Sequence, residues 1–144
     1  MHLKLYIDRL EQFSVHCGAT VIRNSLVGGV LGRVEGRRIV LRSGLSLERQ
    51  VLTLAHELTH LIAHCNVSPR LNRTVCEYEA EAVERWVGAE LKVSPYAEEG
   101  FDVSSLTDDL LAGSVVRVRW VARTLLSAAR DGVSAAVERA RLQA

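Results

Sequence analysis

Two histidines and a glutamate near the middle of the chain have the types and spacing needed for metal chemistry. Residues 56–60 read His-Glu-Leu-Thr-His, an H-E-x-x-H pattern. On a helix, residues four apart lie on one face about one turn apart, so His56 and His60 can bind one metal ion. Glu57 borders the same position, where its carboxylate can act as a general base toward water. The pattern predicts a catalytic metal site with Zn²⁺ as its ion.

The segment around this motif is apolar on nearly every side. A helix of that kind is normally buried, and histidines and a glutamate in a core require partners or a bound ion. We expect the helix to run from Leu47 to His64, with Ser46 as its N-cap and Glu48 in its first turn. Asn66 then ends the helix.

A third metal ligand is expected from the helix that follows. Catalytic zinc usually has three protein ligands and one position open to water. Helical phase places Glu79 on the apolar face of the segment, while Glu77 and Glu81 fall on the opposite side. A buried carboxylate is costly unless it is paired or bound to a metal, so Glu79 is the predicted ligand. Glu77 is assigned to a capping box with Thr74.

Two alternatives to this ligand set stay open. Glu81 is the reserve choice for the third ligand, and Glu79 could instead form a buried pair with an arginine or with one of the motif histidines. His64 follows His60 by four residues but lies about 12 Å along the axis from His56, too far for one straight helix to wrap round one ion. His64 is therefore predicted to support the site without binding the ion.

The rest of the chain predicts an α+β fold, with a small twisted sheet packed on the motif helix. Hydrophobic periodicity and turn residues indicate a helix over 3–14, strands over 19–23, 30–34 and 38–42, a helix over 74–91, a short helix near 106–111, a helix over 115–129 and a weak terminal helix over 134–144. The last two strands are expected to form a hairpin. Residues 19–92 are the expected core and 104–144 a C-terminal helical extension of one domain spanning 1–144.

Composition indicates an ordinary globular protein in a reducing compartment. Hydrophobic residues make up 48% of the chain, charged residues 24%, and the net charge is +1, which gives no general attraction to nucleic acid or membrane. The three cysteines form no C-x-x-C pair, and the N-terminal residues are charged too early for a signal peptide. We expect a cytoplasmic protein.

These residues resemble those of the ImmA/IrrE family of zinc metallopeptidases. The resemblance covers roughly residues 20–91 and is carried by Arg38-Ile39-Val40-Leu41, by the stretch from Thr53 to His64, and by Glu79-Ala80-Glu81-Ala82-Val83. It implies a zincin-like fold in which His56, His60 and Glu79 bind zinc and Glu57 is the general base. Glu84 and Arg85 depart from the small or aromatic residues typical of the family, which keeps the choice between Glu79 and Glu81 open.

The resemblance also implies a protein substrate. Members of this family occur in bacteriophages and mobile elements, and some cleave helix-turn-helix repressors, so such a repressor is a candidate substrate. We expect an extended substrate to add as a strand to the edge formed by residues 38–42. His64, Tyr78 and Tyr96 are the side chains of suitable type to stabilise the oxyanion.

The rival interpretation is an interaction module whose zinc has no catalytic role. From Ser114 onward the chain holds six arginines against Asp131 and Glu138, a local charge of +4 that could contact an acidic partner or nucleic acid. A solvated basic face is the commoner explanation of such a stretch, and the chain shows no zinc-finger or P-loop pattern. Glu57 favours the enzyme, because a structural site needs ligands but no base.

Overall fold

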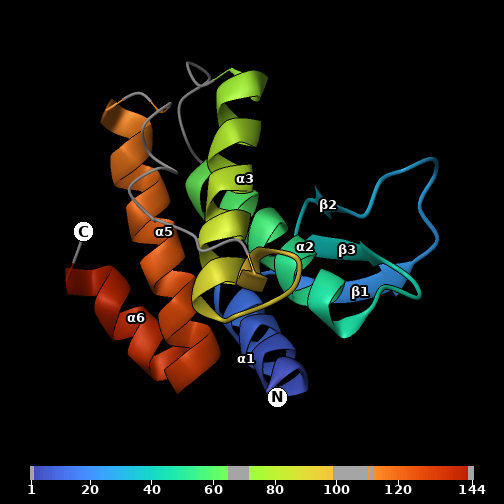
Figure 1. The fold of residues 1–144 in the computed structure, drawn as a ribbon, viewed down its shortest axis with the longest axis horizontal. Helices are drawn as coiled ribbons and strands as arrows, with labels where there is room; N and C mark the ends of the chain where they lie inside the picture. The colour runs from blue at the N-terminus through green and yellow to red at the C-terminus, as the bar shows by residue number, and fades with distance from the viewer. Residues whose placement is uncertain (1, 65–71, 99–109, 111, 143–144) are drawn as a thin grey trace.

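The structure is a computed structural model, and it describes residues 2–64, 72–98, 110 and 112–142 of the 144-residue chain. In chain order the elements are α1 (Leu3–His16), β1 (Thr20–Asn24), β2 (Gly32–Glu35), β3 (Arg38–Arg42), α2 (Leu47–Thr59), the π-helical turn η1 (His60–His64), α3 (Arg73–Glu90), the 3₁₀ turn η2 (Tyr96–Glu98), α5 (Ala112–Asp131) and α6 (Val133–Leu142). The fold class is α+β, as the sequence predicted (Figure 1).

The three strands form one mixed sheet in the order β1-β3-β2. β2 and β3 are the predicted antiparallel hairpin, and Gly36 adopts φ +57° in the turn between them. β1 pairs with β3 in parallel, so β3 is the central strand. The expectation that residues 38–42 offer a free edge to substrate is therefore wrong, and β2 is an edge strand instead.

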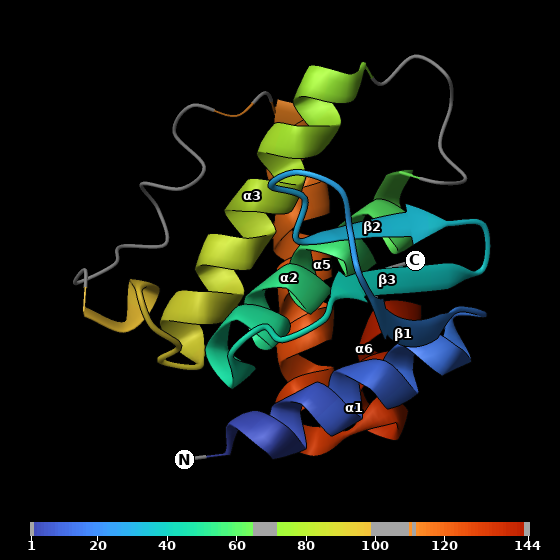
Figure 2. The same ribbon diagram turned by 90° about the vertical axis from the view of Figure 1, so that its right-hand side faces the viewer.

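Helix α2 lies between the sheet on one side and helices α3 and α5 on the other (Figures 1 and 2). It begins as predicted, with the Ser46 hydroxyl accepting a hydrogen bond from the Arg49 backbone N–H. Its residues from Val51 to Ala55 are all buried, in agreement with an apolar helix in a core. The last turn, from His60 to His64, widens into a π-helix, so the helical segment continues to His64 in a different geometry.

Helix α3 is enclosed by two neighbours, because it packs against both α2 and α5. Its N-cap is Asn72, whose side-chain oxygen accepts a hydrogen bond from the Val75 N–H. The predicted capping box of Thr74 and Glu77 is therefore wrong, since the helix begins earlier at Arg73. The side chain of Glu77 is left available for other contacts.

The C-terminal helices complete the core. Helix α5 begins at Ala112, so Gly113 and Ser114 lie in its first turn. The helix break expected at these two residues is therefore wrong. Gly132, at φ +98°, separates α5 from α6 at the predicted break. Apart from Leu110, the short helix expected near 106–111 falls outside the described residues.

Helix α1 contacts α5 at the opposite end of the chain. Its predicted apolar stripe is buried in the common core: Leu3, Ile7, Leu10 and Phe13. The Arg9 guanidinium donates hydrogen bonds to the carbonyls of Ala129 (3.2 Å) and Arg130 (2.6 Å), which lie in the last turn of α5. No helix among the described residues is long and apolar enough to cross a membrane.

Candidate metal centre

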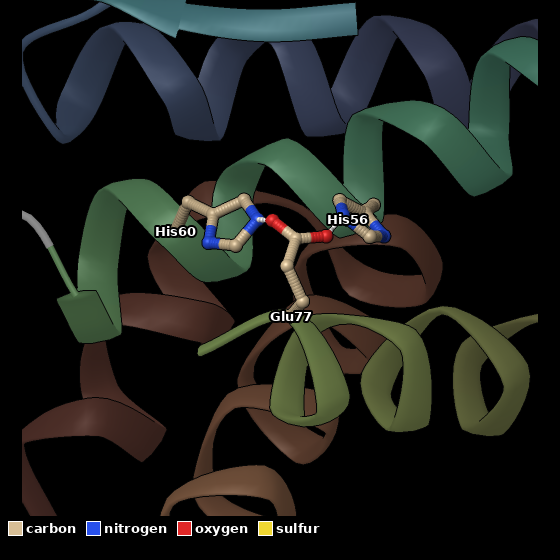
Figure 3. A group of neighbouring side chains, drawn as sticks. All are labelled: His56, His60 and Glu77. Atoms are coloured by element: carbon tan, nitrogen blue, oxygen red, sulfur yellow. Dashed lines mark ion pairs between the residues drawn. The ribbon is translucent and has the colours of Figure 1, made fainter. Parts of the chain in front are cut away.

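Helices α2 and α3 bring two imidazoles and one carboxylate together. His56 of α2 and His60, the first residue of η1, lie one turn apart, with ring centroids 5.0 Å apart. The Glu77 carboxylate of α3 lies between them, 3.3 Å from His56 Nε2 and 2.9 Å from His60 Nε2 (Figure 3). One donor atom from each of the three residues lies within 4.8 Å of the other two, a spacing that one metal ion can bridge. The predicted histidine pair therefore faces a common point.

The structure places Glu79 elsewhere. Its side chain is buried, only 1% exposed, as the helical phase predicted, but it points toward α5. There it accepts hydrogen bonds from Ser114 and Arg117, and its Oε1 lies 3.0 Å from His64 Nε2. This is the buried pairing that the sequence left open as an alternative, and Glu77 is the glutamate of α3 that lies against the two histidines instead. Glu81 is exposed and lies outside the three-residue donor group.

The different positions of Glu79 and Glu77 on α3 have a simple physical cause. The phase argument assumed that α3 has one buried face, but α3 lies between two helices and therefore has two. Glu79 is on the face toward α5. Glu77, Glu84 and Gly88, spaced seven and four residues apart, form the second face, toward α2. A glycine in phase with two glutamates was the available signal, because glycine marks a close approach between helices.

The other ring nitrogen of each histidine also has a partner. His56 Nδ1 lies 3.1 Å from Glu84 Oε1, and Glu84 Oε2 accepts a hydrogen bond from the Tyr96 hydroxyl at 3.0 Å. His60 Nδ1 lies 2.9 Å from His64 Nδ1. Histidines that bind metals usually have their second ring nitrogen held in this way, which fixes the orientation of the ring. Sequence reasoning had missed Glu84.

The donor group lies within a family match. A family model described as the IrrE N-terminal-like domain, a peptidase family, matches residues 11–98. The chain belongs to this family. The match confirms the resemblance to ImmA/IrrE proteins and supports a metallopeptidase-like function. No curated protein and no solved structure matches the chain.

Within this IrrE-like domain, Glu57 occupies a buried position beside the donor group. Glu57 as a whole residue is only 7% exposed. Burial raises the pKa of Glu57 to about 7; the charge of His56 opposes this shift, and those of Glu77 and Glu84 add to it. The structure therefore places a carboxylate with a strong proton affinity next to the two histidines.

The two histidines differ in their electrostatics. Burial lowers the pKa of His60 to about 4, so its ring is neutral at pH 7, the form that binds metals. Burial also disfavours the charged form of His56, but the hydrogen bond to Glu84 and the nearby charges of Glu57, Glu84 and Glu77 hold its pKa above the ordinary value.

A cavity of about 670 Å³ opens beside the donor group. One wall is the β2 region, residues 30–34, and the opposite wall includes His56, Glu57, His60 and Glu77. Gly32 allows β2 to lie close to α2, because a Cβ at this position would lie 2.7 Å from the Thr53 methyl group and 3.2 Å from Glu57 Cγ. Cys76 also lines the cavity but is not one of the three donor residues.

Proposed function

We propose that this IrrE-like domain is a zinc-dependent metallo-endopeptidase. The observation that carries the proposal is the convergence of His56, His60 and Glu77 on one point beside the buried Glu57, at the wall of an open cavity. Membership of a peptidase family supports it. A site with a structural ion alone would need neither the adjacent carboxylate nor the cavity.

The donor set fits zinc. Two imidazole Nε2 atoms and one carboxylate oxygen are typical ligands of catalytic Zn²⁺, which keeps its fourth position open. We propose His56, His60 and Glu77 as the three ligands. When bound there, zinc would supply Lewis-acid chemistry toward a water molecule and a substrate carbonyl.

The residues of the chain would then perform the proton transfers. Glu57 would accept a proton on its carboxylate from the attacking water and deliver that proton to the nitrogen of the leaving amine. Glu84 would hold His56 in place through Nδ1, as the 3.1 Å contact suggests. Gly32 would keep β2 close enough for a bound peptide to lie beside Glu57.

We propose an extended protein segment as the substrate, bound along β2. An edge strand can accept a peptide by strand addition, and β2 both forms an edge of the sheet and borders the cavity. Val30 and Leu31 line the cavity with exposed apolar side chains, which would favour apolar residues near the scissile bond. A helix-turn-helix repressor of a phage or mobile element, in the cytoplasm, is the candidate that the family resemblance suggests.

Metal analysis of purified variants tests the ligand set. We expect one zinc per chain by mass spectrometry in the wild type, in Glu57→Gln and in the exposed control Glu81→Ala. Glu77→Ala should lose most of its zinc, because removing one of three ligands weakens a site severely. Zinc retained in Glu77→Ala but lost in Glu81→Ala would move the third ligand to Glu81.

Activity then separates the enzyme from an interaction module. With a peptide library as substrate, zinc-loaded Glu57→Gln should be slower than the wild type by a factor on the order of 100 or more, since it lacks the general base. A wild-type protein that holds zinc but cleaves no peptide or repressor would favour the interaction module. A wild type that binds no metal would end the peptidase proposal.

A further inference from the structure

A series of polar side chains, buried at its centre, connects α5 to His60. It starts at Ser114 and Arg117 of α5, continues through Glu79 of α3 and His64 of η1, and ends at His60. The side chains of Glu79 and His64 are 1% and 6% exposed, whereas that of Arg117 is 32% exposed. The contact between Glu79 and His64 is therefore interior, where water cannot readily replace it.

The hydrogen-bond donors around Glu79 determine the charge of its carboxylate and its role as an acceptor. Arg117 donates from Nε at 2.9 Å and from its terminal nitrogen at 2.8 Å, and the Ser114 hydroxyl donates to the same carboxylate. A permanently charged guanidinium in this geometry keeps Glu79 ionised. An ionised carboxylate can only accept hydrogen bonds, so His64 must carry its proton on Nε2, the atom 3.0 Å away.

The contact between His60 and His64 joins this series to a proposed metal ligand. His60 Nδ1 lies 2.9 Å from His64 Nδ1, and His60 Nε2 lies 2.9 Å from the Glu77 carboxylate. Binding an ion through Nε2 needs a free electron pair on that atom, so a neutral His60 would then carry its proton on Nδ1 and donate it to His64. The series therefore offers His60 an acceptor that suits the metal-binding form of its ring.

We propose that Ser114 and Arg117 are positioning residues of the metal site, which hold His60 in its orientation through Glu79 and His64. The proposal rests on the proposed metal site. Neither residue lies in the stretch that the family model matches, residues 11–98. Helix α5 would therefore support a site whose proposed ligands come from α2, η1 and α3.

A purely structural role is the alternative, because the Arg117–Glu79 pair also fastens α5 to α3. The double variant Glu79→Leu/Arg117→Met distinguishes the two. Replacing a buried ion pair by apolar residues of similar size is often neutral for stability, so this variant should fold while it leaves His64 without its acceptor. His64→Leu interrupts the series and keeps the ion pair. Arg130→Met is the matched control, since Arg130 binds Glu90 and links the same two helices away from the site.

Two measurements on the full chain test the proposal. In zinc-loaded protein, proton NMR should show a slowly exchanging Nδ1 proton on His60 in the wild type and in Arg130→Met, and a faster exchanging one in the double variant and in His64→Leu. The dissociation constants for Zn²⁺ and Co²⁺ should rise 10- to 100-fold in the double variant and in His64→Leu, with a changed Co²⁺ absorption spectrum.

Unchanged exchange of the His60 Nδ1 proton in a folded double variant, or metal affinity within twofold of wild type in His64→Leu, would overturn the proposal. Failure of the metal site itself has a different signature. If the wild type binds neither Zn²⁺ nor Co²⁺, the proposed function fails, whereas equally tight binding in the wild type and in both variants would contradict this proposal alone.

Discussion

Three carboxylates surround the ring of His56, and their proximity shapes the chemistry of the site. Glu57 is adjacent in sequence, Glu77 lies 3.3 Å from Nε2, and Glu84 lies 3.1 Å from Nδ1. After burial, the charges of Glu77 and Glu84 are what raise the pKa of Glu57 toward 7, against the opposing charge of His56. A divalent cation would relieve this repulsion, because it adds positive charge where negative charge is concentrated.

Glu57 should destabilise the metal-free fold at high pH. Its pKa is about 7 in the folded protein against a reference value of 4.5, so the unfolded chain releases this proton first. The resulting loss in the free energy of unfolding grows as pH rises from 4.5 to 7 and is complete above that range. It is on the order of 3 kcal/mol at pH 8 and about 1 kcal/mol at pH 5. Glu57→Gln should therefore unfold at higher urea than wild type in EDTA at pH 8, with a smaller difference at pH 5.

The exposed variant Glu81→Gln is the control for this comparison and should show little difference at either pH. A Glu57→Gln protein whose gain is the same at both pH values, or which is less stable than wild type at pH 8, would contradict the assigned environment of Glu57.

At the residue scale, sequence spacing predicted that His56 and His60 lie on one helix face, but not which residues surround them. Four-residue spacing on a helix places His56 and His60 on one face whatever the rest of the fold does. The partners at Nδ1 depend on side-chain rotamers and on how α3 and η1 lie against α2. Neither Glu84 nor the orientation of His64 could follow from periodicity.

Among the elements, α2 and α3 must approach closely for their side chains to share one ion. Gly88 of α3 permits this, because a Cβ there would lie 2.8 Å from Leu52 Cδ2 and 2.6 Å from Tyr96 Cδ2. The same face of α3 presents Glu77 and Glu84 to α2. The spacing of the two helices and the geometry of the donor group are thus set together.

Gly88→Ala should lower the stability of the protein even though alanine favours helix. Overpacking of this kind costs about 1–3 kcal/mol, which exceeds the propensity gain of at most about 1 kcal/mol. Thermal and urea unfolding of the metal-free protein would measure it. Gly113→Ala is the control in a helix, since the nearest atom to its Cβ is the flexible end of Arg117 at 3.5 Å. Equal or greater stability in Gly88→Ala would show that the helices can separate without cost.

Sequence patterns predicted most elements but not how they are arranged. The helix in α1, the three strands and the α2 N-cap agree with expectation because each follows from local periodicity or turn chemistry. The position of β3 at the centre of the sheet did have a signal. Ile39, Val40 and Leu41 are consecutive buried residues, a pattern typical of a strand covered on both faces rather than of an edge. The two buried faces of α3 had no comparably clear signal.

For the molecule as a whole, a metal ion would connect separate parts of the core. Its proposed ligands come from α2 and the η1 turn that follows it, and from α3; α2 packs on the sheet and α1, and α3 packs on α5. An ion that binds only the folded state stabilises it by mass action, by about 2.7 kcal/mol at a free concentration 100 times the dissociation constant. The effect should reach elements far from the site.

Zinc should therefore raise the melting temperature of the wild type over an EDTA-treated sample by roughly 5–10 °C at that concentration. Differential scanning calorimetry would measure the shift, and it should be nearly absent in Glu77→Ala. A shift of equal size in Glu77→Ala would mean that zinc binds at another place on the molecule.

The contact between Arg9 and the end of α5 also matters for how the protein is made. Arg9 and Ala129 are 120 positions apart, so a ribosome adding 5–20 residues per second needs roughly 6–24 s to pass from one to the other. During that interval the apolar stripe of α1 has emerged while its α5 partner does not yet exist. The nascent chain therefore presents the apolar face of α1 before α5 can pack against this helix.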